Sequence, residues 1–246
     1  MLKPAGAELR ADRAFIDLHC HTRASFDSLS SPRSVVQGAA RRGLTHLAIT
    51  DHDRIDGALA ARELAPPGLT VIIGEEVRTA GGDLICLFLE EAVPPGLSPA
   101  ETIERVRAQG GLVGIPHPFD RFRGSLLRDG RLAGLAGLVD WVETYNARLV
   151  GSGNERAAAF AREHGLPGVA VSDAHSLLEV GVACSIVHGD PGTPAGLLAA
   201  LVGVELVTGR ASYAVRALTP IAKLVQRTRG NRRIRPALPS GLSPSA

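Results

Sequence analysis

Short apolar runs, rich in aliphatic residues, recur along the chain, and most of them end in polar residues. Runs of about four to eight such residues are typical of buried strands. We therefore expect strands at 15–19, 44–50, 70–74, 83–89, 112–116, 138–145, 169–172, 182–187 and 205–208.

Helix signals lie between most of these runs. Ser31 and Pro32 supply an N-cap and a first-turn proline for a helix that ends at Gly43. Ser98 and Glu101 have the spacing of a capping box for a helix that ends at 110–111. Three more helices are expected: a short one at 59–64, one capped by Asn154, and one capped by Thr193.

Alternation of strands and helices predicts a mostly parallel sheet with helices outside it. Gly81 and Gly82 are typical of a hairpin turn, so the strand at 83–89 is expected to run antiparallel to the strand before it. The length of 246 residues and the apolar content of 45% are sufficient for one large core. A chain of about 250 residues is also a common length for a single α/β barrel.

Histidines and carboxylates stand where the expected strands end. His19 and His21 are two residues apart, as are Asp173 and His175, so each pair points to one face of an extended strand. Each pair is therefore a potential metal chelate. His52, Glu76 and His117 follow three other runs and share this placement.

These placements favour a closed barrel over an open doubly wound sheet. A barrel brings the carboxyl ends of its strands to one mouth, whereas an open sheet spreads them along a line. We expect an α/β fold of distorted barrel type with a metal site at the carboxyl ends of the strands. Imidazole and carboxylate ligands together suit Mn, Zn or Fe.

The formal charge of +2 excludes the whole molecule as an obvious nucleic-acid or anionic-membrane binder. We divide the chain into an extension at 1–13, a barrel at 14–220 and a basic, Pro/Ser-rich and flexible tail at 221–246. The three cysteines lie in apolar runs and suggest buried thiols in a reducing compartment. The expectation is a cytoplasmic protein with neither a membrane association nor an obligate protein partner.

Five motifs in order carry a family resemblance. They are Asp-Leu-His-Cys-His-Thr at 17–22, Ile-Thr-Asp-His-Asp at 49–53, Gly-Glu-Glu at 74–76, Pro-His-Pro at 116–118 and Ser-Asp-Ala-His at 172–175. With this set, residues 14–190 resemble the PHP (polymerase and histidinol phosphatase) family. The resemblance implies a distorted (β/α)7 barrel that binds two or three divalent metal ions and hydrolyses phosphoesters.

The resemblance also implies roles for single residues. One metal would be held by His19, His21, Glu76 and Asp173, with Glu76 bridging towards the others. A second would be held by His52 and His175, and His117 would contribute to a third.

The sequence departs from the family pattern at two places. The family's acidic ligand is the fifth residue after the second histidine, where this chain has Phe26, and we expect Asp27 to take that role. Relatives with a full third site often carry a histidine in the segment that is Asp-Leu-Ile-Cys-Leu at 83–87 here. Occupancy of the third site is therefore left open, with water or Glu143 as other ligands.

Other polar residues near these motifs receive supporting roles. Asp51, Asp53 and Glu143 are interpreted as residues that orient a histidine or a water molecule, and Asp27, His52 and Glu76 as the catalytic set. Arg23, Arg121 and Arg123 are the candidate substrate-binding cations.

The favoured function is hydrolysis of a phosphoester in a small phosphorylated metabolite or nucleotide by a metal-bridging hydroxide. One alternative is an exonuclease that acts on short RNA or DNA ends and uses the basic tail. The other is a non-catalytic barrel that metals only stabilise.

Overall fold

The computed structural model describes residues 13–120, 133–234 and 236 of the chain. Within these residues, nine strands form one sheet in the order β7-β6-β5-β4-β3-β2-β1-β8-β9. Their bounds are β1 Arg13–Asp17, β2 His46–Ile49, β3 Thr70–Arg78, β4 Asp83–Leu87, β5 Leu112–Ile115, β6 Trp141–Asn146, β7 Gly168–Val171, β8 Cys184–His188 and β9 Glu205–Val207.

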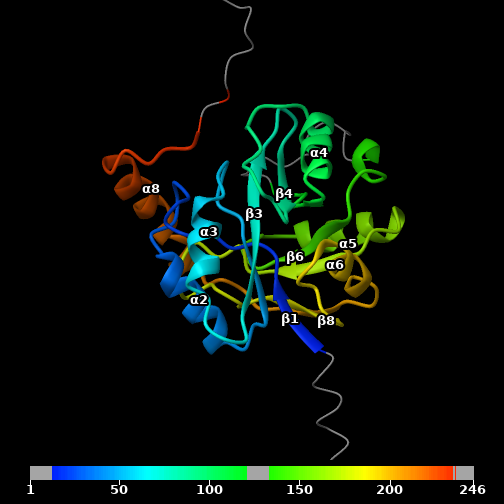
Figure 1. Cartoon of the computed structure of the whole chain (residues 1–246), viewed down its shortest axis with the longest axis horizontal. Coiled ribbons are helices and arrows are strands. Elements are labelled where there is room, and N and C mark those ends of the chain that lie inside the picture. Colours follow the sequence, from blue (N-terminus) through cyan, green and yellow to red (C-terminus); the bar gives the residue numbers. More distant parts are fainter. Residues whose placement is uncertain (1–12, 121–132, 235, 237–246) are drawn as a thin grey trace, which may run out of the picture.

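Most of the sheet is parallel, as the alternation of elements predicts. β1, β2 and β3 pair in parallel, and so do β5, β6 and β7. β4 is antiparallel to both of its neighbours, which confirms the predicted hairpin, and β8 is antiparallel to β1 and β9. Together with an isolated parallel bridge between Cys20 and Ala174, this order curls the sheet into a nearly closed barrel (Figure 1).

Closure also uses a buried serine between β7 and β8. Ser185 accepts a hydrogen bond from the Ala170 N–H at 2.8 Å and donates one to its carbonyl at 3.1 Å. A nearly closed α/β barrel is therefore confirmed, whereas a count of seven strand–helix units is not. β4 and β8 interrupt the parallel repeat: β4 forms a hairpin with β3, and β8 runs antiparallel to β1 and to β9.

Helices cover the outside of the sheet. α2 and α3 lie beside β1–β3, and α5 and α6 lie on the opposite side of the molecule (Figure 1). The bounds are α2 Pro32–Arg41, α3 Asp56–Glu63, α4 Pro99–Ala108, α5 Gly153–Glu163, α6 Pro194–Ala200, α7 Tyr213–Arg216 and α8 Leu218–Thr228, with a short 3-10 helix η2 at Ala133–Leu135.

Two hydrophobic clusters lie on opposite faces of the sheet. The first joins alternate strand residues such as Leu47 and Ile49 to the apolar sides of the helices α2 to α5. The second contains the intervening strand residues, among them Ile16 and Trp141, and includes residues of α6. Both faces of the strands are thus buried, which explains their continuously apolar sequences.

Several predicted boundaries match the structure. Ser31 accepts a hydrogen bond from the Ser34 N–H, and both hydrogen bonds of the Ser98–Glu101 capping box are present. Gly43 has a φ of +81°, which is the left-handed conformation that favours glycine after a helix.

Several boundaries differ from prediction, among them the end of β3 and the starts of α3 and α5. β3 continues to Arg78, because β4 pairs with it from Gly74 to Arg78. Glu76 therefore lies within a strand, opposite Ile85. α3 begins at Asp56, before the predicted start. Ser152 is the N-cap of α5, and Asn154 bonds to the Asn146 backbone instead.

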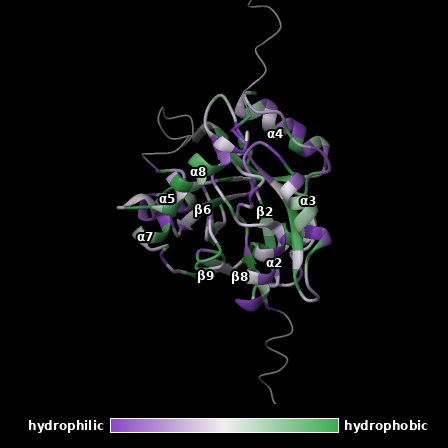
Figure 2. Ribbon diagram, turned by 90° about the vertical axis from the view of Figure 1, so that its left-hand side faces the viewer, coloured by the Kyte–Doolittle hydropathy of each residue, from purple (hydrophilic) through white to green (hydrophobic). Residues whose placement is uncertain are grey.

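The predicted boundary between residues 220 and 221 falls inside α8, because that helix runs without a break from Leu218 to Thr228. α8 lies beside the loop that follows β1 (Figure 1). It is rich in hydrophobic residues (Figure 2), and Leu218, Ile221 and Leu224 are exposed. No helix in the described part of the chain is long and apolar enough to cross a membrane.

Candidate metal centre

Two stretches far apart in the sequence lie side by side at the mouth of the barrel. The His21 N–H donates to the Ala174 carbonyl at 2.9 Å, and Cys20 forms the bridge to Ala174 that helps to close the sheet. This pairing of residues 19–21 with 173–175 brings the two predicted chelates together. Cys20 turns away from them into the hydrophobic core.

The first cluster of ligand atoms combines His19 and His21 with Glu76 and Asp173. His19 Nε2 and His21 Nε2 are 3.0 Å apart, and they lie 3.3 and 3.4 Å from Glu76 Oε2. Asp173 Oδ1 is 3.6 Å from each of these nitrogens. Ligand atoms bound to one ion at about 2.0–2.2 Å lie roughly 3 to 3.6 Å apart. The donor set therefore fits a divalent cation.

A second cluster forms around Asp27. Asp27 Oδ2 lies 3.3 Å from His52 Nε2 and 3.3 Å from His175 Nε2. Ligand atoms of these three residues and His21 all lie within 4.8 Å of one another. The Phe26 ring packs on the His52 ring, with centroids 5.0 Å apart. The structure thus places Asp27, rather than Phe26, among the candidate ligands.

Glu76 connects three groups of ligands. Its Oε2 faces the first cluster and also lies 3.1 Å from His52 Nδ1, whereas its Oε1 lies 3.1 Å from His117 Nε2. Asp83 stands in the segment where relatives with three metals carry a histidine, and its carboxylate accepts a hydrogen bond from Arg233 Nη2 at 2.9 Å.

Glu143 lies behind the first cluster. Its Oε1 is 2.6 Å from His19 Nδ1, and its Oε2 accepts hydrogen bonds from the His117 N–H at 2.8 Å and from Asn146 Nδ2 at 2.9 Å. Asn146 Nδ2 also donates to Asp173 Oδ2 at 3.0 Å. A carboxylate at Nδ1 leaves Nε2 of His19 free to bind a cation, which is a common arrangement around metals.

Asp51 and Asp53 have different partners. Asp51 accepts hydrogen bonds from the Thr22 N–H and hydroxyl at 2.6 and 2.7 Å and from the Ser25 N–H at 3.2 Å, so it orders the loop after β1. Asp53 accepts from the Arg78 N–H at 2.8 Å and from Arg233 Nε at 3.0 Å. Their hydrogen-bond partners are thus backbone, hydroxyl and guanidinium groups.

Three residues around the centre have a left-handed backbone although they are not glycines. They are Asp53 with φ 58°, His117 with φ 26° and Asp173 with φ 51°. Such conformations cost free energy and concentrate at functional sites.

The carboxylates of the centre favour positive charge. Burial lowers the pKa of His19, but Glu143, Asp173 and Glu76 raise it more, so the pKa lies well above its usual value. Burial also lowers the pKa of His52, whereas Glu76 and Asp27 raise it, to about 9. Without metal, protons on these rings would balance the negative charge of the carboxylates. Bound divalent cations would replace that positive charge.

The carboxylates themselves are held in the ionised form. Burial raises the pKa of Asp27, but His175 and His52 lower it more, to well below its usual value. Burial likewise raises the pKa of Glu76, while His52 and His19 bring it well below that of a free glutamate. Burial and the neighbouring His175 keep the pKa of His21 low. A neutral imidazole and ionised carboxylates are the forms that bind metal.

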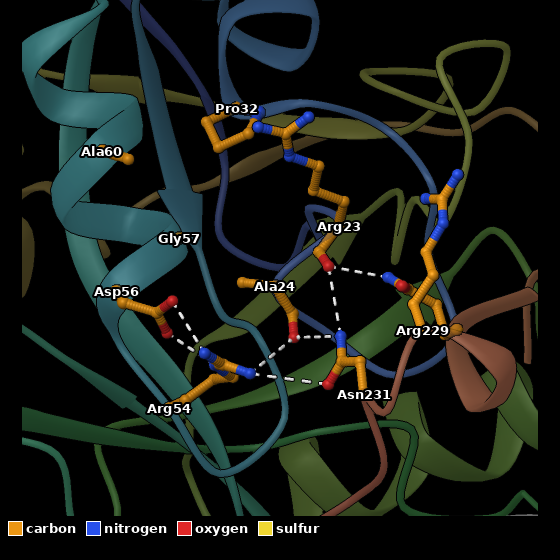
Figure 3. Close-up of a pocket in the computed structure, with 10 residues that line it drawn as sticks. Arg23, Ala24, Pro32, Arg54, Asp56, Gly57, Ala60, Arg229 and Asn231 are labelled. Atoms are coloured by element: carbon orange, nitrogen blue, oxygen red, sulfur yellow. Dashed lines mark hydrogen bonds and ion pairs between the residues drawn. The ribbon is translucent and has the colours of Figure 1, made fainter.

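The candidate substrate cations are less clearly placed. Arg23 lines a cavity of about 480 Å³ between the loop after β1, α3 and the C-terminal residues (Figure 3), and none of the eight predicted ligands lines it. Arg121 and Arg123 lie outside the described residues.

Sequence reasoning missed three residues from the end of the chain. Arg233 is paired with Asp53 and Asp83, while Gln226 and Asn231 bond to the loop after β1. Their basic, polar surroundings suggested a solvated tail, and no motif marks them.

Comparisons with known proteins agree with this geometry. The family model of the PHP domain matches residues 17–113, and the model described as PHP-associated matches residues 151–202. An uncharacterized protein of Methanocaldococcus jannaschii is 39% identical over 142 residues, which are 53% of this chain and 81% of that protein. The chain belongs to the PHP family.

A second relative matches a shorter part of this PHP protein. A 5'-3' exoribonuclease of Haemophilus influenzae is 42% identical over 67 residues, which cover 26% of this chain and 23% of the relative.

Solved structures show the same fold. A two-domain protein from Bacteroides vulgatus that contains a predicted PHP-like metal-dependent phosphoesterase has a TM-score of 0.67 at 19% identity. That match covers 80% of this PHP chain and 65% of the other. The lesion-specific endonuclease Q of Pyrococcus furiosus has a TM-score of 0.60 at 18% identity, with 79% and 57% covered.

Proposed function

We propose that this protein is a metal-dependent phosphoesterase that acts on a small phosphorylated metabolite or nucleotide. The observation that supports it best is the pair of ligand clusters that share His21 and meet at Glu76. When bound there, two or three divalent cations, Mn, Zn or Fe, would supply a hydroxide nucleophile at neutral pH and neutralise the phosphate oxygens.

The protein's own residues would orient this chemistry. Glu143 holds the His19 ring, and the hydroxyl of Ser25 donates to Asp27 Oδ1 at 2.8 Å, which leaves Oδ2 to the second cluster. His52 and His175 are each 8% exposed, whereas His19 and His21 are 0% and 1% exposed. A substrate phosphate would therefore approach from the second cluster, so Asp27, His52 and Glu76 are the proposed catalytic residues.

Substrate selection would depend on cations near the mouth. Arg23 follows the first chelate and is exposed. With Arg121 and Arg123, it is our proposed contact for the remaining phosphate or sugar groups of the substrate, because a guanidinium can bind two phosphate oxygens at once.

An exonuclease that acts on RNA or DNA ends is the second candidate. It is supported by the match to the Haemophilus influenzae exoribonuclease and by a second exposed arginine, Arg229, in the cavity that Arg23 lines. Binding to a phosphate backbone would weaken steeply as the salt concentration rises, whereas binding of a mononucleotide would weaken far less.

The test is phosphate release by the Mn²⁺- or Zn²⁺-loaded protein from mononucleotides, sugar phosphates, bis(p-nitrophenyl) phosphate and short oligonucleotides. We expect release from a small substrate, at least 100-fold slower in His19→Ala. Turnover of oligonucleotides alone would favour the exonuclease. Absence of turnover in a protein that binds metal would favour the alternative of a non-catalytic, metal-stabilised barrel.

A further inference from the structure

The C-terminal segment, residues 218–234, lies outside both regions that the family models match. We propose that it completes the metal centre: Gln226 and Asn231 are positioning residues that hold the ligand loop, residues 22–28, and thereby hold Asp27 against His52 and His175. This inference rests on the metal centre of the proposed function.

Gln226 reaches the ligand loop from α8. Its Nε2 lies 2.7 Å from the Arg23 carbonyl, 3.0 Å from the Ser25 carbonyl and 2.7 Å from the Ser28 carbonyl. The residue is 3% exposed. Since buried carbonyls need a partner, one side chain about 200 positions away satisfies much of the loop backbone.

Asn231 binds the outer side of the same loop. Its Nδ2 lies 3.2, 3.0 and 3.3 Å from the carbonyls of Arg23, Ala24 and Ser25. Figure 3 shows that Arg54 joins this contact, since its Nη1 donates to the Ala24 carbonyl at 3.2 Å. Asp56 fixes that guanidinium through Nη2 at 2.8 Å.

Ser25 connects these contacts to the metal ligands. Its carbonyl is shared by Gln226 and Asn231, while its hydroxyl donates to Asp27 Oδ1 at 2.8 Å. The other oxygen of Asp27 then points at His52 and His175. Movement of the Ser25 backbone would therefore displace a ligand of the second cluster.

The end of the C-terminal segment is anchored separately. Arg233 bonds to Asp53 at 3.0 Å and to Asp83 at 2.9 Å, and the Ile234 carbonyl accepts from Arg78 Nη2 at 2.6 Å. These bonds join the segment to the loop after β2 and to the β3–β4 hairpin. The segment thus contacts both the ligand loop and the β3–β4 hairpin.

The first cluster has different supports. His19 is held by Glu143, and Glu76 lies in the sheet between β2 and β4. Loss of the Gln226 contacts should consequently affect the site that contains Asp27 and spare the other. A residue that only packs α8 against the barrel would change stability and leave both metal affinities equal to wild type.

The experiment titrates Mn²⁺ into the metal-free full-length protein by calorimetry, with bound metal counted by mass spectrometry. Gln226→Met keeps the side-chain length but removes the amide. We expect its affinity to fall about 10- to 100-fold at one site only, the site that Asp27→Asn also weakens. Arg227→Met, an exposed neighbour on α8, should match wild type.

Wild-type affinity at both sites in Gln226→Met, even with a lower melting temperature, would overturn the inference. If Gln226→Met does not fold, Asn231→Ala must show a smaller loss of Mn²⁺ affinity at the same site. An unchanged affinity at that site would also overturn the inference. Phosphate release is measured in parallel. A wild-type protein that binds Mn²⁺ but hydrolyses nothing refutes the proposed function and leaves the role of Gln226 intact.

Discussion

Glu143 has hydrogen-bond donors against both of its oxygens. His19 Nδ1 faces one, and the His117 N–H and Asn146 Nδ2 face the other. Only an ionised carboxylate accepts on both sides, because an amide must present an NH₂ group to one of them. A single residue therefore sets the ring orientation of one proposed ligand and the backbone position of another.

Glu143→Gln should for this reason lower the affinity for Mn²⁺ by about 10- to 100-fold at the site that contains His19. Calorimetric titration of the metal-free protein measures this change. Glu163→Gln, an exposed residue at the end of α5, is the matched control and should bind like wild type. Equal affinities in the two variants would show that Glu143 does not orient His19.

At the scale of single elements, two helices with a serine N-cap differ in their hydrogen bonds. Ser98 caps α4, accepts from the Glu101 N–H at 3.2 Å and has its own N–H bonded by the Glu101 carboxylate at 2.9 Å. Ser152 precedes α5 without a side-chain cap bond. The sequence signal at 98–101 was reliable because a capping box needs only local geometry.

Ser98→Ala should lower the free energy of unfolding by about 0.5 to 2 kcal/mol, whereas Ser152→Ala should change it by only a few tenths. Urea denaturation of both variants tests this difference. Similar losses in both would mean that the capping box adds nothing to the stability of α4.

At the scale of the whole molecule, the proposed ligands come from five strands of the sheet and one loop. They follow or lie in β1, β2, β3, β5 and β7, and Asp27 belongs to a loop held by α8. Cations at these positions would tie distant parts of the chain together, so binding to the folded state alone should stabilise the entire barrel.

Mn²⁺ at 100 times its dissociation constant should add about 2.7 kcal/mol to the metal-free protein, which corresponds to a rise in melting temperature of roughly 5 to 10 °C. Scanning calorimetry after chelation and reloading measures it. His19→Ala should show a smaller rise, and an equal rise in that variant would place the stabilising ion elsewhere.

The metal-free protein should also respond to pH. The pKa of His52 is raised to about 9 by Glu76 and Asp27 against the effect of burial, so the folded state binds more protons than the unfolded state between pH 6.5 and 9. The resulting stability is complete below pH 6.5 and is lost as the pH rises through 9.

We thus expect the free energy of unfolding of the chelated protein to fall between pH 6.5 and 9, by at most about 1.4 kcal/mol per pH unit for each such group. Urea denaturation in a chelating buffer across this range tests the slope, and His52→Gln should flatten it. A stability that rises with pH would contradict the proposed charge state of the ring.

The sequence by itself determined the alternation of strands and helices, the helix starts capped by Ser31, Ser98 and Thr193, and the positions of the candidate ligands at the strand ends. Each of these depends on short-range rules: side chains alternate along a strand, and a cap lies within one helical turn of its partner. His19 and His21 could be paired on one face for this reason, and the PHP motifs placed Asp173 and His175 opposite them.

Only the tertiary structure decided how the parts support one another. The length of β3 depends on pairing with β4, which embeds Glu76 in a strand. The bonds of Gln226 and Asn231 to the ligand loop, and the ion pairs of Arg233, join residues more than 100 positions apart. No local pattern encodes such contacts, because their free energy exists only after the chain has closed into a barrel.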